Sequence, residues 1–360
     1  MRHERALSFP HRAAGTRVRD LSVVHTESVP AFTDNHVGIV GYLVAYGVSA
    51  MLVLPEHARQ GGIGQTMGIL EHVRGAAKAL LGPKATKRLG RYLRRSKPLP
   101  SAQVYRDLLV GKSGLELGGP SNIFGDEGFL PVYRDLQSLD NCLYSSSTIW
   151  TGNVAEGGTF EFHPSKAKGK QIICEASDLA PISDEAYECV LASHCLEHVA
   201  NPLRALAEWT RVLGPDGLLL LIMPHREGTF DWRRRVTTLE HMISDRENNV
   251  GENDLTHLAE ILELHDLSRD KAAGSMEQFR QRCLDNYSKR AMHHHVFDTP
   301  STIRMLDYCD FKILRVDNLE PYHIVVLAQK CQTHPDNMDF LGPNADYRRM
   351  SPFSADRASS

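Results

Sequence analysis

The chain has 360 residues, of which 42% are hydrophobic and 24% charged. This is the composition of a globular protein with enough apolar material for a substantial core. The formal net charge of -3 gives no reason to expect a nucleic-acid partner. The seven cysteines include no Cys-x-x-Cys pair, which indicates reduced thiols in a cytoplasmic protein and excludes a disulfide framework or a zinc module of paired cysteines.

Residues 1–100 form an N-terminal extension with two unusual segments. The run 37–54 carries no charge and is just long enough to cross a bilayer as one helix, although a buried helix or a pair of strands would also explain it. The segment 84–97 is basic and contains no acid, so it either contacts anionic lipid headgroups or forms a solvated linker. The expected localisation is therefore cytoplasmic, with membrane attachment through 37–54 as an open alternative.

Short apolar runs alternate with helical segments over residues 101–331, which predicts an α/β domain with a mostly parallel sheet. The alternation stops between the expected strand 217–223 and the last two strands. Three helical stretches there indicate a helical insertion over 225–298. Residues 332–360 are rich in Pro, Asn, Asp, Arg and Ser, and predict a flexible tail. The expected strands are 114–117, 136–139, 187–191, 217–223, 312–318 and 323–328.

The first expected strand leads into a glycine loop with the sequence SGLELGGPSNIFG. Gly118 and Gly119 allow a sharp turn and a close approach of the backbone to a ligand, and Ser121 follows in the same loop. Glu116 ends the strand, where an acid would repel a pyrophosphate. A ligand with a cationic ammonium group is therefore favoured over a dinucleotide.

Two further acids follow in the order that a nucleotide-binding α/β fold requires. Asp140 stands at the end of the next expected strand, a little over 20 residues after Glu116, where a carboxylate holds ribose hydroxyls. Asp178 precedes Leu179 in a polar turn before the strand that ends at Ser193 and His194. One acid alone would be an ordinary turn or capping residue, so it is the ordered set that points to a cofactor site.

These segments resemble class I S-adenosylmethionine-dependent methyltransferases of the methyltransferase type 11 group. The similarity lies in Leu115–Gly119, Asp178–Leu179, Tyr187–Val199 and the segment GPDGLLLLIMPH. It implies a Rossmann-like fold with a terminal antiparallel strand, and S-adenosyl-L-methionine as the cofactor. By this resemblance the methionine end of the cofactor would be held by Glu116, Gly118 and Gly119. The ribose would be held by Asp140, and the adenine by Asp178 and Leu179. The strand that ends at Ser193 and His194 would place these two residues beside the cofactor.

Histidines are the candidates for proton transfer to and from an acceptor, because their pKa lies near neutrality. His225 closely follows the expected strand 217–223, and the run His293-His294-His295 closes the insertion. The predicted catalytic residues are therefore His225, His294 and His295. The insertion would cover the acceptor site. His194, Glu197 and His198 share a helical face, and with His225 they could hold a metal ion; the alternative, that they orient a loop without a metal, is the one adopted here.

The sequence thus predicts a methyltransferase acting on a small-molecule, glycan or lipid-precursor acceptor, at oxygen. Pro120 and Asn122 interrupt the glycine pattern usual in the family, which leaves a non-catalytic methyltransferase-like partner protein as one alternative. A nicotinamide-dependent oxidoreductase is a second alternative, opposed by Glu116 and by the missing Gly-x-Gly-x-x-Gly motif.

Overall fold

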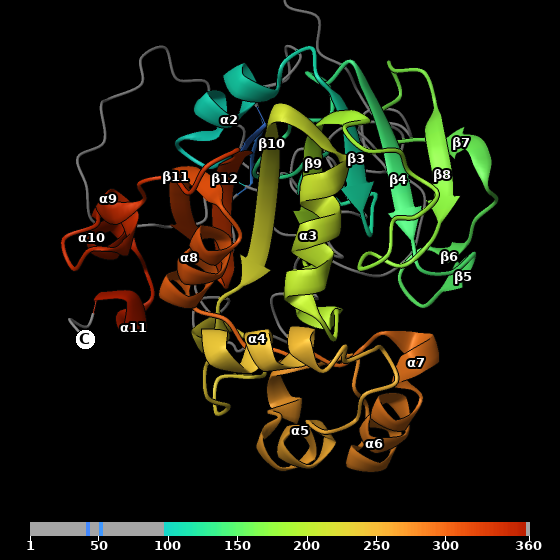
Figure 1. Cartoon of the computed structure of the whole chain (residues 1–360), viewed down its shortest axis with the longest axis vertical. Helices are drawn as coiled ribbons and strands as arrows, with labels where there is room; N and C mark the ends of the chain where they lie inside the picture. Colours follow the sequence, from blue (N-terminus) through green and yellow to red (C-terminus); the bar gives the residue numbers. More distant parts are fainter. Residues whose placement is uncertain (1–40, 44–49, 53–96, 358–360) are drawn as a thin grey trace, which may run out of the picture. The chain divides into compact units, whose positions relative to one another are not determined.

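A computed structural model describes residues 41–43, 50–52 and 97–357 (Figure 1). The chain divides into two units, residues 1–90 and 91–360. In the first unit, β1 (Gly41–Leu43) and β2 (Ala50–Leu52) pair antiparallel within the apolar run 37–54. The remainder of that run and residues 84–96 of the basic segment lie outside the described residues. Within the described ranges, no helix has the length and apolar character needed to cross a membrane.

The second unit is built on an eight-stranded mixed sheet with the order β11-β12-β10-β9-β3-β4-β8-β7. β3, β4, β8, β9 and β10 run parallel, and β12 is antiparallel to both β10 and β11. β7 is antiparallel to β8 at the opposite edge. The predicted Rossmann-like sheet with an antiparallel strand near the end of the chain is confirmed. The strands are β3 (Ser113–Leu117), β4 (Ser138–Leu143), β7 (Gly157–Phe160), β8 (Gly169–Ile173), β9 (Tyr187–Ser193), β10 (Leu213–Pro224), β11 (Phe311–Leu319) and β12 (His323–Lys330).

Each face of this sheet has its own apolar core. Leu115 and Leu117 of β3 point to the face covered by α3 (Pro202–Val212) and α8 (Thr299–Tyr308), because side chains alternate along a strand. On this face Trp209 is fully buried, and its Nε1 donates to the carbonyl of Ala176 at 2.9 Å. The other face is covered by α2 (Ala102–Leu109) and the irregular crossover between β3 and β4. Glu116 points to that second face, which matters for the site.

The segment between β10 and α8 gathers at the carboxyl edge of the sheet, below the arrowheads of β3, β4 and β10 (Figure 1). It contains α4 (Leu239–Glu247), α5 (Leu258–Leu264), α6 (Met276–Leu284) and α7 (Asn286–Lys289). Its separate apolar core is small, with five buried residues: Ile261, Ala273, Phe279, Cys283 and Met292. Packing alone therefore stabilises this segment weakly, and polar interactions must supply part of its order.

The structure differs from the sequence-based predictions in two parts of the chain. The strands β7 and β8, and the small hairpin of β5 (Ser147–Thr148) and β6 (Gly152–Asn153), were not predicted from the sequence. The expected flexible tail contains three short helices instead: α9 (Met338–Leu341), α10 (Asp346–Met350) and α11 (Ser354–Arg357). Tyr347 packs into the core on the α3 side, and Phe353 stacks on His225 with ring centroids 4.0 Å apart.

Asp356 anchors this C-terminal segment, because its buried carboxylate accepts four hydrogen bonds. The donors are Ser351 Oγ (2.6 Å), Thr299 Oγ1 (2.7 Å), Asn318 Nδ2 (3.1 Å) and His225 Nε2 (3.3 Å). The carboxylate therefore joins the tail to α8, β11 and the end of β10.

We predict that Asp356→Ala lowers the free energy of unfolding by about 3 kcal/mol or more, because it leaves several buried donors without an acceptor. Urea unfolding followed by circular dichroism measures the change. Asp346→Ala in the same segment is the matched control, since the Asp346 side chain is 88% exposed and its loss should change stability by less than about 0.5 kcal/mol. Equal stability of the two variants would show that the tail is not anchored in this way.

Candidate active site

The glycine loop directly follows β3 at the carboxyl edge. Gly118 has a φ of +80°, and its N–H donates to the carbonyl of Cys142 at 2.9 Å. A side chain at Gly119 would place its first carbon 2.3 Å from the carboxylate of Glu116. Glycine is therefore required at both positions, at the first by backbone conformation and at the second by space.

The loop is held by a residue that the sequence analysis missed. Asn141 of β4 is fully buried and exchanges two hydrogen bonds with Gly119, accepting from its N–H at 2.9 Å and donating to its carbonyl at 3.1 Å. The same amide donates to Gln171 of β8 at 2.9 Å. No motif marks Asn141, because a buried amide inside a strand resembles a turn residue in the sequence.

Glu116 lies beneath this loop with only 1% of its surface exposed. The Tyr133 hydroxyl donates to its carboxylate at 2.7 Å, and the backbone N–H of Ser121 donates to it at 3.0 Å. Burial raises the pKa of Glu116 to about 7, and these hydrogen bonds oppose the rise. A positive charge placed beside Glu116 would favour the ionised form of its carboxylate. Binding of a cationic group at this position is therefore favourable.

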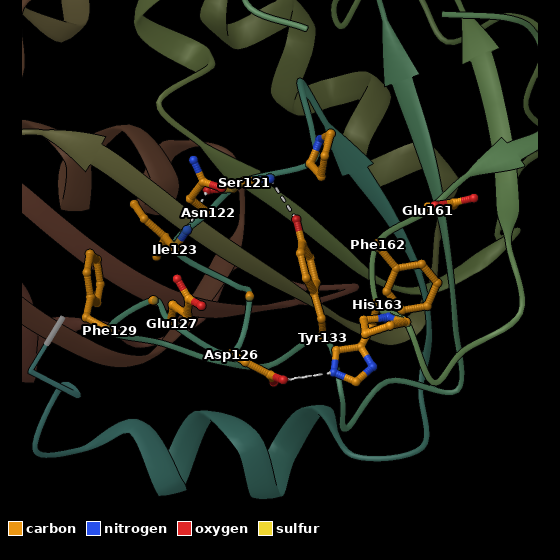
Figure 2. A pocket seen from close by; sticks show the side chains of 14 residues that line it. Ser121, Asn122, Ile123, Asp126, Glu127, Phe129, Tyr133, Glu161, Phe162 and His163 are labelled. Carbon is orange, nitrogen blue, oxygen red and sulfur yellow. Dashed lines mark hydrogen bonds and ion pairs between the residues drawn. The ribbon is translucent and has the colours of Figure 1, made fainter. Parts of the chain in front are cut away.

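A cavity of about 650 Å³ lies beside the glycine loop, between residues 120–129 and 161–164 (Figure 2). Of the predicted site residues, only Ser121 lines it, together with Tyr133 and His163. Figure 2 shows the bond from Ser121 to the Tyr133 hydroxyl and the contact of His163 with Asp126. None of the strand ends of β4, β8, β9 or β10 contributes to the lining, so this cavity is separate from the expected cofactor position.

Asp140 does not lie where a ribose would be bound. β4 begins two residues later than expected and continues to Leu143, which puts Asp140 inside the strand. Its carboxylate accepts from the Tyr187 hydroxyl at 2.8 Å and from the backbone N–H of Lys170 at 2.7 Å. The strand end carries Tyr144 and Ser145 and no acid. The ribose assignment of Asp140 is therefore wrong.

The adenine assignment also needs correction. Leu179 is completely buried in the core on the α3 side and cannot contact a ligand. The Asp178 side chain is 54% exposed and faces Arg204 on α3, 3.6 Å away. The acid that directly follows β8 is Glu175, whose candidacy the sequence analysis missed because β8 was not predicted.

Ser193 and His194 end β9 at the carboxyl edge, as predicted. The Ser193 hydroxyl is buried and has no hydrogen-bond partner. His194 has a φ of +51°, a strained conformation for a residue with a side chain, and such strain is concentrated at functional sites. Its Nε2 lies 2.9 Å from Nδ1 of His323, and its Nδ1 lies 3.5 Å from the Glu197 carboxylate.

The three histidines predicted to be catalytic are all buried. His225 is fully buried between Phe353 and Asp356. His294 and His295 are each 1% exposed; His294 Nε2 bonds to Asn286, and His295 Nε2 donates to the carbonyl of Ala200. None of the three can reach an acceptor in this structure, whereas the His194 side chain is 24% exposed.

A network of charged groups lies beneath His194. Glu197, His198 and His293 place ligand atoms within 4.8 Å of one another, as a metal site would. His293 Nδ1 also lies 2.5 Å from Asp231, itself paired with Arg234 at 3.1 Å. Burial alone would lower the pKa of His293, but Asp231 outweighs it and the pKa is raised. Nδ1 of His293 is thus already engaged by the Asp231 carboxylate, and the group forms a hydrogen-bonded ion network in the described structure.

The insertion reaches the ends of β4 and β8 through Arg290. Its guanidinium lies 2.6 Å from Glu175 and 2.7 Å from Glu252, and 5.0 Å from the ring centre of Tyr144. Tyr144 follows β4, which pairs with β3, and Glu175 follows β8, which pairs with β4. No pattern in the sequence marks Arg290 or Tyr144 as a site residue, because only the tertiary structure brings them together.

Comparisons with known proteins agree with this architecture. Residues 159–221 match the model of a family described as a methyltransferase domain. A search of curated protein sequences finds no significant match. Solved structures that are similar include an S-adenosylmethionine-dependent methyltransferase from Methanosarcina mazei, with 17% identity, a TM-score of 0.36, and coverage of 66% of this chain and 100% of that one.

Two other similar structures have bound partners or ligands. One is 1,6-didemethyltoxoflavin-N1-methyltransferase from Burkholderia thailandensis, with 10% identity, a TM-score of 0.37, and coverage of 78% of this chain and 94% of that one. The other is a Haloferax volcanii methyltransferase in complex with the activator Trm112, with 11% identity, a TM-score of 0.39, and coverage of 73% and 100%. Likenesses this distant carry no argument about the acceptor or a partner.

The family match over residues 159–221 and the order of the strands are those of a methyltransferase domain built on a Rossmann-like sheet. The residues at the carboxyl edge fit the cofactor in three respects: an open glycine turn at Gly118, a buried acid at Glu116 and an unpartnered hydroxyl at Ser193. The departures are Asp140, which lies inside β4, and Leu179, which is buried in the core.

We predict that Gly118→Ala weakens binding of S-adenosylmethionine about tenfold, or ~1.4 kcal/mol, because the new methyl group occupies the ligand side of the turn. Inside the protein that carbon would lie 3.5 Å from Cys195 Sγ, an ordinary contact. Gly111→Ala is the control, since Gly111 has a similar φ of +75° and open surroundings. Calorimetry should show unchanged affinity for the control. Absence of binding by the wild-type chain at millimolar cofactor would favour a non-catalytic partner protein.

A second prediction concerns acid stability. Burial, with a smaller contribution from the charge of His194, lowers the pKa of His323 to about 3. Below about pH 6.5 the unfolded chain binds a proton at this residue and the folded chain does not, so stability falls as pH falls toward 3. Between pH 7 and pH 5 this histidine should account for a loss of about 2 kcal/mol.

Urea unfolding at the two pH values tests this prediction. His323→Asn should reduce the difference in unfolding free energy between pH 7 and pH 5. The exposed His334 provides a contrasting variant, His334→Asn: its hydrogen bond with Asp310 raises the pKa of His334, so losing it should slightly widen the difference between pH 7 and pH 5. An unchanged pH dependence in His323→Asn would show that His323 is protonated in the folded protein.

Proposed function

We propose that the chain methylates a hydroxyl oxygen of a small-molecule, glycan or lipid-precursor acceptor, with His194 as the general base. The observation that carries this proposal is the pairing of the His194 ring with a buried carboxylate: Nδ1 lies 3.5 Å from Glu197, which is 1% exposed. A histidine held by a carboxylate at the edge where ligands bind in such sheets is suited to accept a proton from a hydroxyl.

The protonation states support this role. Burial alone would raise the pKa of Glu197, but the hydrogen bond from His194 and the charges of His198, His194 and His293 lower it below the ordinary range. An ionised Glu197 can only accept, so the proton of a neutral His194 sits on Nδ1. The lone pair then belongs to Nε2, which faces His323 and the edge of the sheet.

S-adenosylmethionine supplies the methyl group on an activated sulfonium, so the protein's own task is alignment and proton removal. With the methyl group supplied by the bound cofactor, the proton of the acceptor hydroxyl would pass to Nε2 of His194 as its oxygen is methylated. The acceptor hydroxyl takes the place of His323 as the partner of this nitrogen. Glu197 then stabilises the resulting imidazolium.

The surroundings favour a hydroxylated acceptor with a flat apolar face. The indole of Trp150 is 58% exposed and lies with its ring centre 5.6 Å from that of His198, next to Glu197 in the chain. Tyr322 lies 5.4 Å from His194. Exposed aromatic side chains next to polar groups are typical of sites that bind small ligands in a fixed orientation.

We predict that His194→Gln lowers turnover by about 10²- to 10⁴-fold, the usual contribution of a general base, while the affinity for S-adenosylmethionine changes little. The assay incubates the full chain with methyl-labelled cofactor and pools of small hydroxylated metabolites, glycans and lipid precursors, and identifies products by mass spectrometry. His334→Gln serves as the control substitution on the surface. Glu197→Gln should also lower turnover, because the carboxylate that lies 3.5 Å from Nδ1 of His194 and would stabilise its imidazolium is lost.

Three results would contradict this proposal. The first is wild-type turnover in His194→Gln. The second is a product methylated at nitrogen or sulfur in place of oxygen. The third is wild-type turnover in Glu197→Gln, which would show that the carboxylate does not act on His194.

A further inference from the structure

Three histidines from separate parts of the insertion converge in a group distinct from that of Glu197, His198 and His293. His241 belongs to α4, His257 precedes α5, and His295 lies in the run that returns to the sheet. One ring nitrogen of each lies within 4.8 Å of the others. The Nε2 atoms of His241 and His257 are 3.2 Å apart.

A carboxylate lies beside the group. Asp245 lies one turn after His241 on α4, and its Oδ2 is 3.4 Å from His241 Nε2 and 3.6 Å from His295 Nε2. This oxygen is buried and has no hydrogen-bond partner. Two ligands bound 2.0–2.1 Å from a tetrahedral zinc ion lie roughly 3.3 Å from each other. The distances from His241 to His257 and to Asp245 are therefore those of two edges of a zinc tetrahedron.

His295 shows the same lack of a partner. Its Nε2 donates to the carbonyl of Ala200 at 3.1 Å, so the lone pair of the neutral ring is on Nδ1. That nitrogen is buried and accepts no hydrogen bond. A carbonyl acceptor on the distal nitrogen is the usual way in which proteins orient a metal-binding histidine. An N–H···N bond could join His241 to His257, but it would still leave Asp245 Oδ2 and His295 Nδ1 unpartnered.

Charge distinguishes this group from the network of Glu197, His198 and His293. In that network the carboxylates of Glu197 and Asp231 are accompanied by the guanidinium of Arg234 and by His293, whose Nδ1 lies 2.5 Å from Asp231. The group of three histidines has one carboxylate beside it, Asp245, and among the ion pairs of the described residues that carboxylate has no arginine or lysine partner. Neutral imidazole with one carboxylate is a ligand set for a divalent ion of intermediate softness.

We propose that His241, Asp245, His257 and His295 bind one structural Zn²⁺ ion, which holds α4, the start of α5 and the returning chain together. The insertion has five buried apolar residues in its own core, and segments of this kind are commonly stabilised by a metal. The His241 side chain is 43% exposed, so the ion can enter from that side. This proposal is independent of the methyl-transfer reaction.

The test uses the full chain, stripped with a chelator and then supplied with Zn²⁺. Elemental analysis should find one zinc per chain, and the midpoint of thermal unfolding should rise on reconstitution. His241→Ala and His257→Ala should each weaken zinc binding about 100-fold or more, since a metal ligand is lost. His198→Ala and the surface variant His334→Ala should keep the full zinc content.

X-ray absorption on the zinc-loaded wild type makes the test independent of whether the variants fold. Three imidazoles and one oxygen ligand are expected, whereas the Glu197 group would give two imidazoles. The proposal is overturned if the wild type binds no zinc, if zinc content survives in both His241→Ala and His257→Ala, or if it is lost in His198→Ala. A spectrum with fewer than three imidazoles would overturn it too.

Discussion

The burial of the Glu197 carboxylate is the constraint on which the carboxyl edge of this protein depends. A buried charge without partners is strongly destabilising, so the chain has to bring cationic or hydrogen-bonding groups to it. His194 and His198 come from the same turn, while His293 comes from the far end of the insertion. The carboxylate is thus surrounded by three imidazoles, and its charge in turn orients His194.

The same requirement extends outward through the insertion. His293 is held by Asp231, and Asp231 is paired with Arg234, whose guanidinium also donates to the carbonyls of His293 and His294 at 2.8 and 3.1 Å. The backbone N–H of His294 donates to the carbonyl of Glu197 at 2.9 Å. These bonds fix the returning chain against the turn after β9. A segment with little apolar core is therefore docked mainly by buried polar groups, and each of them is costly to leave unpaired.

Histidine serves several different purposes in this one edge. His225 is a structural residue that joins β10 to Asp356 and Phe353. His194 is exposed and strained, which suits it to contact a ligand, and the group of His241, His257 and His295 has the geometry of a metal site. Position in the sequence does not separate these purposes, since all lie within about a hundred residues of each other. Burial and the partner of each ring nitrogen separate them.

The sequence by itself determined the class of the fold and the place of the glycine loop, because both depend on local patterns. Apolar runs alternating with helical segments specify a parallel sheet, and an acid before two glycines marks the turn after β3. It also located Ser193 and His194, since a strand end is visible in the pattern. Asp140 was misplaced because Asn141, a buried amide paired with Gly119 and Gln171, reads as a turn residue.

Only the tertiary structure decided which polar residues share a site. Glu175 and Arg290 lie 115 residues apart and His194 and His323 129 residues apart in the chain, and no periodicity links them. The tail shows the same limit: its polar composition indicated flexibility, yet the Asp356 carboxylate finds four donors from α8, β11, β10 and its own turn. Polar partners at long range decide these positions, and their energies arise from burial, which the order of residues along the chain does not reveal.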